Sequence, residues 1–119
     1  MKDETTYIYV IAPKESDGPC KIGVTNSPAS RLRTVQTGNP HDVEYIMQYR
    51  LPSRSVAFTI ETDTHNYCNM VRLTGEWFDM TKLAAIRALH RTVLISLQKF
   101  YKGNQYEDVL HDAITWDIP

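Results

Sequence analysis

Three stretches of the chain carry the residue pattern of β-strands. Apolar and polar side chains alternate from Val43 to Leu51, between two prolines, and this period of two predicts a half-buried strand. Two shorter runs, Tyr7 to Ala12 and Cys20 to Thr25, are rich in aromatic and β-branched residues. A loop with two prolines and a glycine separates these runs, so we predict an antiparallel hairpin with a connection longer than a tight turn. It places Tyr9 and Lys21 on neighbouring strands.

A short helix is predicted between the second and third strands. Ser27 before Pro28 is a favourable helix start, because the serine oxygen can accept from a free backbone N–H and proline at the first helical position loses no hydrogen bond. Gly38 and Pro40 predict its end. Arg31 lies inside this helix.

A longer helix is predicted from about Arg54 to Arg72. Apolar residues fall on one helical stripe in this stretch, and no glycine or proline follows Arg54 until Gly75. Glu61 and His65 lie four positions apart, so they share one face of the helix.

The last third of the chain is predicted to be mainly helical. Glu76 to Asp79 is aromatic and compact, which predicts a short extended segment that closes the sheet. Apolar spacing of three and four residues predicts a helix from about Lys82 to Lys102, ended by Gly103. One more turn is predicted from Tyr106 to Ile114, with Trp116 docked on the body of the protein.

These elements predict one domain with an α/β fold of the α+β type, in which a small, largely antiparallel central sheet is flanked by helices. Apolar residues make up 42% of the 119 residues and charged residues 23%, and no apolar run approaches the roughly 20 residues that span a bilayer. We therefore expect no membrane contact. The polar start lacks the apolar core of a secretory signal, so we expect a cytoplasmic protein with free thiols at Cys20 and Cys68.

The distribution of charge favours an anion-binding site in the first two thirds of the chain. A net charge of −1 argues against a protein that coats nucleic acid through a large basic surface. Arginines and Lys21 nevertheless gather before residue 73, whereas acidic residues dominate the end of the chain.

Tyr9, Lys21, Arg31 and Glu61 are together the side chains needed to hydrolyse a phosphodiester. Arg31 and Lys21 would neutralise the phosphate, and a metal ion held by Glu61 would stabilise the departing 3′ oxygen. The attacking water needs a base. We expect the two cations to lower the pKa of Tyr9 from its ordinary value of about 10. His65 is the alternative base. Taken singly, each of these residues is more often packed or solvated.

The order of elements, with Tyr7-Ile8-Tyr9 on the first strand and Lys21-Ile22-Gly23 on the second, resembles the GIY-YIG nuclease superfamily. It is most similar to the small phage and bacterial branch, in which lysine begins the second motif. The resemblance covers about residues 7 to 80, and its specificity lies in order and spacing together. It implies a catalytic core at residues 1–80 and a helical extension at residues 81–119 that packs on this core.

The resemblance also implies the residues of the site. Those that match the superfamily's functional positions are Tyr9, Lys21, Gly23, Arg31, Glu61 and His65. Two positions depart from the signature, since Tyr7 stands where the first motif begins with glycine and Lys21 where the second begins with tyrosine.

The implied function is a metal-dependent DNA endonuclease with one Mg²⁺ or Mn²⁺ per site, held by Glu61. With no recognition module attached to the core, specificity would come from DNA structure or from a partner protein. The main alternative is a nucleic-acid-binding or protein-interaction module that kept the fold and lost cleavage, and a third is a protein-binding regulator. Tyr9, Arg31 and Glu61 together favour the enzyme.

A zinc site and a base-stacking surface are two further hypotheses. Glu61, His65 and Cys68 lie on one helical face, but structural zinc usually takes four ligands, and no second pair of cysteines exists. Trp77 and Phe78 could stack on bases, although such a pair beside a sheet is more often core. Glu76 and Asp79 are expected to be structural, and either replaces Glu61 as metal ligand if the helix is aligned differently.

Overall fold

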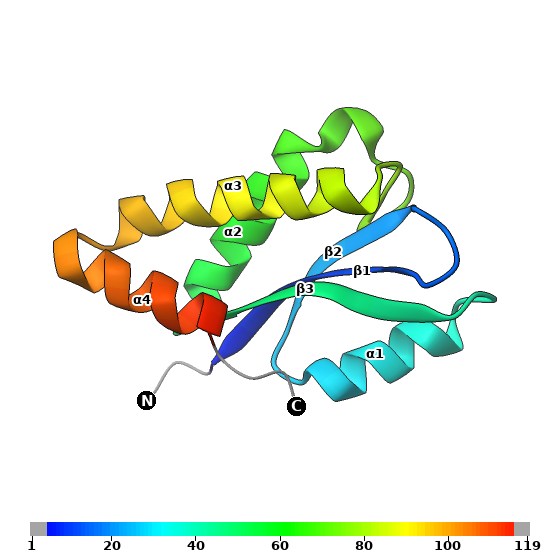
Figure 1. Cartoon of the computed structure of the whole chain (residues 1–119), viewed down its shortest axis with the longest axis horizontal. Helices are drawn as coiled ribbons and strands as arrows, with labels where there is room; N and C mark the ends of the chain where they lie inside the picture. The colour runs from blue at the N-terminus through cyan, green and yellow to red at the C-terminus, as the bar shows by residue number, and fades with distance from the viewer. Residues whose placement is uncertain (1–4, 116–119) are drawn as a thin grey trace.

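A computed structural model describes residues 5–115 of the protein (Figure 1). In the described part of the chain, four strands, four α-helices and one 3-10 helix follow one another. Their bounds are β1 (Thr6–Pro13), β2 (Cys20–Thr25), α1 (Pro28–Thr37), β3 (Val43–Leu51), α2 (Arg54–Tyr67), η1 (Asn69–Val71), β4 (Trp77–Phe78), α3 (Lys82–Phe100) and α4 (Gly103–Thr115).

The four strands form one antiparallel sheet in the order β3-β1-β2-β4. β1 and β2 form the predicted hairpin, in which Tyr9 lies opposite Gly23 and Ile11 opposite Lys21. β1 also pairs with β3 along its whole length, so it is a central strand. β4 pairs only with the first two residues of β2. The predicted fold class, a small antiparallel sheet flanked by helices, is confirmed.

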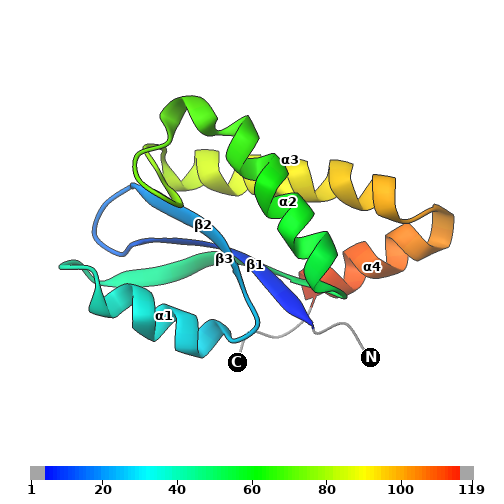
Figure 2. The same cartoon turned by 180° about the vertical axis from the view of Figure 1, so that it is seen from behind.

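Helices cover both faces of the sheet, with α2, α3 and α4 on one face and α1 on the other (Figures 1 and 2). The larger core cluster joins Ile8 and Val10 to apolar side chains of α2 and α3. The smaller one joins Tyr9 and Ile11 to Leu32 of α1. Because side chains alternate along a strand, β1 sends Tyr9 toward the face that α1 covers.

The predicted helix from Arg54 to Arg72 is wrong at its C-terminal end. α2 ends at Tyr67, and a single 3-10 turn follows before the backbone of Arg72 becomes extended. Arg72 forms an isolated antiparallel bridge with Phe78, closed by a turn in which Gly75 has a φ of 58°. The sequence predicts the turn at Gly75, but it does not show that Arg72 pairs with Phe78 across this turn.

The end of the chain also differs from the prediction. The helix expected to reach Lys102 ends at Phe100, and Gly103 begins α4 instead of ending α3. α4 has 13 residues where a single turn was expected. Trp116 lies outside the described residues. No helix in the described part of the chain combines the length and apolar character needed to cross a membrane.

The starts of the helices are largely as predicted. The hydroxyls of Ser53 and Thr81 accept from backbone N–H groups at the starts of α2 and α3. α1 begins at Pro28 as expected, but the Ser27 side chain makes no cap hydrogen bond. The oxygen of Thr25 accepts from the backbone N–H of Ser27 instead.

Candidate active site

The β1–β2 hairpin brings the phenol of Tyr9 over the backbone of Gly23. The two residues are direct partners in the ladder, and Tyr9 is only 1% exposed. A Cβ atom at Gly23 would lie 2.6 Å from the Tyr9 hydroxyl oxygen and 2.6 Å from Oε1 of Glu76. A glycine at position 23 therefore lets a phenol and a carboxylate approach the same point above β2.

Two carboxyl groups meet beside this phenol. Glu61 projects from α2 and Glu76 precedes β4, and the two groups are close enough to share a hydrogen bond. Burial, then repulsion by Glu76, raises the pKa of Glu61 from 4.5 to about 7, while Lys21 and Arg31 lower it less strongly. The second carboxyl oxygen of Glu61, Oε2, is buried and has no hydrogen-bond partner among the described residues.

Lys21 joins the site through Glu76. Its Nζ lies 3.0 Å from Oε1 of Glu76, and its side chain is only 14% exposed. The same ammonium lies 5.8 Å from the centre of the Trp77 ring. Trp77 is the β4 partner of Lys21, so this strand pairing holds Glu76 next to the lysine. Lys21 thus compensates one of the two carboxylates.

Arg31 supplies the second cation from α1. Its charge lowers the pKa of Tyr9, Tyr45 and Glu61, which places the guanidinium near all three groups. Arg31 lines a groove of about 400 Å³. The residues that line it come mainly from β1, the end of β2 and the helices α1 and α2, which Figure 2 shows on either side of β2. The other residues that line the groove include Arg54, Phe58, Glu61, Glu76 and the end of β2. Tyr9 is buried next to the groove.

The Tyr9 hydroxyl is buried and has no hydrogen-bond partner among the described residues. Burial, then the charge of Glu76, raises the pKa of Tyr9 above its ordinary value, and Arg31 opposes this only in part. The expectation that the two cations would favour the phenolate is therefore wrong for this state of the protein. The prediction left out the burial of the ring and the second carboxylate, which outweigh the charge of Arg31. Lys21 is not among the charges that shift this pKa.

His65 lies on the predicted face of α2, but both of its ring nitrogens are engaged. Nε2 donates to the carbonyl of Ile22 at 2.8 Å, and Nδ1 lies 3.0 Å from a guanidinium nitrogen of Arg72, from which it accepts. Because Nδ1 accepts from a guanidinium, the ring is neutral in this arrangement, and burial lowers the pKa of His65. Its centre lies 5.1 Å from that of Phe78. His65 therefore ties α2 to β2 and β4, and neither nitrogen is free to take a proton from water.

Comparison with known families places this site in a recognised domain. The family model of the T5orf172 domain matches residues 6–94. The chain belongs to the T5orf172 domain family. This domain is phage-associated and related to nuclease-like folds. The matched range includes every candidate site residue and reaches into α3. No curated protein and no solved structure matches the chain.

The remaining candidate residues of the T5orf172 domain lie apart from the carboxylates. Tyr7, at the position of the missing motif glycine, is half-buried and lines a second hollow beside α1. Asp79 lines a different hollow near Asp17. Phe78 is fully buried, as expected of a core residue.

Two groove residues of the T5orf172 domain were not among the main catalytic residues predicted from the sequence. Glu76 was expected to be structural, yet its carboxylate contacts both Lys21 and the Glu61 group. Arg54 was counted among the cations of the anion-binding part of the chain but was given no role in the site, yet it lines the groove together with Arg31. The one signal available in advance was the position of Glu76 directly before an aromatic pair expected to close the sheet.

The donor set of the T5orf172 domain can be tested against the metals considered above. Within residues 5–115, no group of three or more His, Cys, Asp or Glu side chains is arranged to hold a metal ion. Mg²⁺ needs fewer protein ligands, because it usually keeps several waters and takes one or two carboxylates together with substrate phosphates. The Glu61 and Glu76 pair, with one buried oxygen lacking a partner, fits that requirement.

Proposed function

We propose that this T5orf172 domain is a metal-dependent DNA endonuclease that hydrolyses phosphodiester bonds by a GIY-YIG type of mechanism with one Mg²⁺ or Mn²⁺ per site. The observation that carries the proposal is that Arg31, Glu61 and Glu76 line one groove. Tyr9 is buried beside it, and Lys21 pairs with Glu76. A module that only binds phosphate needs the cations, but it has no need of two carboxylates held beside them.

The two arginines are suited to bind the phosphate. Arg31 and Arg54 come from different helices and line the same groove, and both are exposed. A guanidinium can hold two phosphate oxygens at once, which fixes the orientation of the scissile group as well as its charge. Lys21 is less available to the phosphate, because it is paired with Glu76.

Glu61, assisted by Glu76, is suited to hold the metal ion. When bound, such an ion supplies positive charge to the phosphate oxygens and to the departing 3′ oxygen. In its absence, burial and then the charge of Glu76 raise the pKa of Glu61. Cation binding and deprotonation of Glu61 would therefore favour each other.

Tyr9 is suited to handle the proton of the attacking water. Its hydroxyl is held rigidly in the sheet and is not committed to another group of the described chain. The charges of Glu61 and Glu76 are two of the causes that raise its pKa. Neutralising these charges would leave Arg31 to favour the phenolate, so Tyr9 is a better base in the loaded site than in the free one. His65 would act as a positioning residue.

The direct test is cleavage of supercoiled plasmid by the purified protein in Mg²⁺ or Mn²⁺, with a chelator as a blank. We expect nicked or linear product from the wild type, and none from Tyr9→Phe, Arg31→Ala or Glu61→Gln. Arg33→Ala is the matched control, since Arg33 is an exposed arginine on the same helix that does not line the groove. It should cleave as the wild type does.

The outcome that contradicts the proposal is a folded wild-type protein that binds DNA and leaves it intact with every metal tested. The alternative, a binding module that kept the fold and lost cleavage, would then hold. Cleavage that survives Glu61→Gln but is lost in Glu76→Gln would move the metal to the second carboxylate.

A further inference from the structure

Three residues contain all of the buried side-chain polar atoms that lack a hydrogen-bond partner in the described chain. They are Tyr9, Gln48 and Glu61. Buried polar groups are nearly always paired, so each exception calls for an explanation. The proposed active site accounts for Tyr9 and Glu61, but it assigns nothing to Gln48.

Gln48 lies beside the catalytic tyrosine. In the β1–β3 ladder it is the direct partner of Tyr9, so the two side chains stand on the same face of the sheet. Gln48 is 8% exposed, and neither its amide nitrogen nor its amide oxygen has a partner among the described residues. A donor and an acceptor thus lie side by side, unpaired, next to the phenol.

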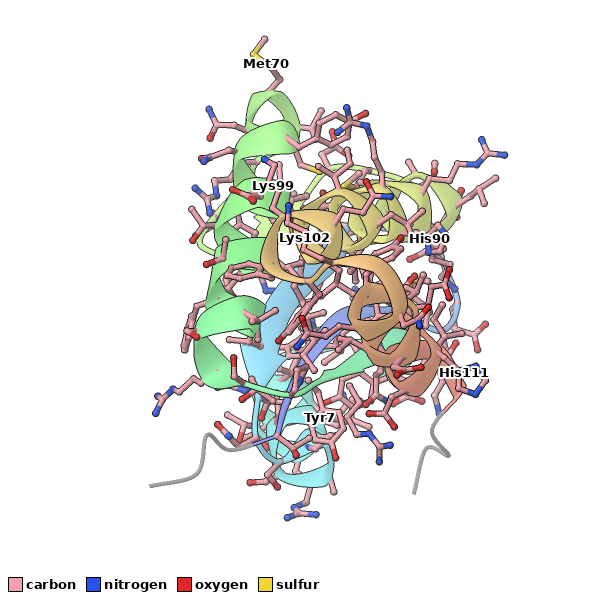
Figure 3. All side chains as sticks on the ribbon, turned by 90° about the vertical axis from the view of Figure 1, so that its left-hand side faces the viewer. Tyr7, Met70, His90, Lys99, Lys102 and His111 are labelled. Atoms are coloured by element: carbon pink, nitrogen blue, oxygen red, sulfur yellow. The ribbon has the colours of Figure 1, made fainter. Side chains whose placement is uncertain are left out.

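A hollow of about 360 Å³ adjoins this amide. Gln48, Tyr7, Tyr45 and Leu32 line it, together with residues 26–29. The Tyr45 hydroxyl donates to the carbonyl of Pro28 at 2.6 Å, and the Tyr45 ring meets that of Tyr9 edge-on with centres 5.4 Å apart. One aromatic wall is therefore fixed. Figure 3 shows Tyr7 on the side of the sheet where α1 lies.

The hollow adjoins the active-site groove. Asn26 and Ser27 line both of them, and the charge of Arg31 reaches both Tyr9 and Tyr45. A nucleotide whose phosphate lies at Arg31 would therefore have its sugar and base close to Tyr7 and Tyr45. Volumes above about 300 Å³ are typical of pockets that take small ligands.

We propose that this hollow binds the nucleobase adjacent to the scissile phosphate, with a preference for adenine, and that Gln48 recognises the edge of the base. The inference deepens the proposed function, since it takes the substrate to be DNA. An amide that presents one donor and one acceptor matches the N6 and N7 positions of adenine, and aromatic walls stack on any base. The base would have to be unstacked from its neighbours, as in enzymes that extrude a base.

The amide is covered in the free protein, so recognition includes a side-chain rotation. The Gln48 amide atoms have almost no exposed surface, whereas Tyr7 at the hollow is only half-buried. Rotation of Gln48 or Tyr7 would bring the amide to the base edge. In the free protein the buried amide has no partner, and this lowers stability. An apolar side chain of the same shape would not carry this cost.

The test measures binding rather than cleavage. Labelled oligothymidylates carry adenine, guanine, cytosine or an abasic site at one central position, and fluorescence anisotropy is measured in a chelator so that no strand is cut. We expect the wild type to bind the adenine oligonucleotide roughly five- to hundredfold more tightly than the abasic one. Gln48→Met, which keeps the side-chain volume, should lose most of this difference and also melt at a higher temperature than the wild type.

Gln98→Met is the matched control, because Gln98 is exposed on α3 and lies outside the hollow. It should keep both the base preference and the melting temperature. Equal binding of all the oligonucleotides by the wild type, a preference that survives Gln48→Met, or a lower melting temperature of Gln48→Met would each overturn the inference. Cleavage without base preference defeats this inference alone, and base preference without cleavage defeats only the proposed nuclease.

Discussion

Gly23→Ala tests the close approach on which the site depends. The added methyl group would lie 2.6 Å from the Tyr9 hydroxyl oxygen, 2.8 Å from Cζ of the same ring and 2.6 Å from Oε1 of Glu76. The Glu76 side chain is 37% exposed and can swing away, but Tyr9 is 1% exposed in the central strand and cannot. The clash with Tyr9 therefore decides the result.

The magnitude follows from two opposing effects. Overpacking of a well-packed site costs about 1 to 3 kcal/mol. Replacing glycine inside a strand gains about 0.5 to 1 kcal/mol, because the unfolded chain loses freedom. The two ranges leave a net loss of up to about 2.5 kcal/mol in the free energy of unfolding, with a middle value of about 1 kcal/mol, which corresponds to a melting temperature lower by roughly 3 to 6 °C.

The assay is chemical and thermal denaturation of Gly23→Ala, Gly38→Ala, Tyr9→Phe and the Gly23→Ala/Tyr9→Phe double variant. Gly38→Ala is the control, since a Cβ there meets nothing closer than 4.0 Å and its φ of −88° suits alanine. It should be neutral or slightly stabilising. Tyr9→Phe removes the hydroxyl that the new methyl group would clash with. Gly23→Ala should therefore lower the free energy of unfolding by less in the Tyr9→Phe protein than in the wild type. A Gly23→Ala protein that melts at or above the wild-type temperature, with Gly38→Ala neutral, would refute the close approach.

Three further predictions concern groups of the same site. Tyr9→Phe should leave the free energy of unfolding unchanged or raise it by up to about 1 kcal/mol, because a buried hydroxyl without a partner is removed; a clear loss in urea denaturation would show that the hydroxyl is paired. The pKa of Glu61 rises from 4.5 to about 7 on folding, so the folded state holds more protons between these values, and stability should fall as pH rises through this window. Melting curves measured in a chelator should show that Glu61→Gln removes this fall in stability. Adding Mg²⁺ at pH 8 should restore the stability of the wild type. An unchanged pH dependence in Glu61→Gln would speak against the raised pKa of Glu61. His65→Ala should lower stability by about 1 to 3 kcal/mol, because the carbonyl of Ile22 loses its donor, while the pH profile of cleavage below the melting temperature stays the same. If the rise of the cleavage rate with pH disappears in His65→Ala, His65 is the base.

The strands could be predicted closely from the sequence because their signals are local. The alternation from Val43 to Leu51 between two prolines gives the bounds of β3, and β-branched runs give those of β2. The end of α2 could not be predicted in this way. It depends on the pairing of Arg72 with Phe78, which is set by the fold as a whole and not by a glycine or proline in the helix.

Most residues of the candidate site could be predicted from the sequence, but their pKa shifts and their partners could not. Tyr9, Arg31 and Glu61 could be proposed from their sequence order and resemblance, and the structure brings them to one groove or its margin. The importance of Glu76 depends on strand pairing that sets Lys21 opposite Trp77. The direction of the Tyr9 pKa shift depends on burial, and the partner of His65 is a backbone carbonyl, which residue identities do not reveal.

The two sides of the site differ in how firmly the sheet supports them. Tyr9 and Gly23 lie within the long pairing of the central strands, whereas Glu76 precedes a strand of two residues at the sheet edge. Short edge strands open at lower free energy than central ones. A rearrangement at that edge would displace the carboxylate and leave the phenol where it is. One wall of the groove is therefore free to adjust, while the aromatic hydroxyl beside it stays fixed.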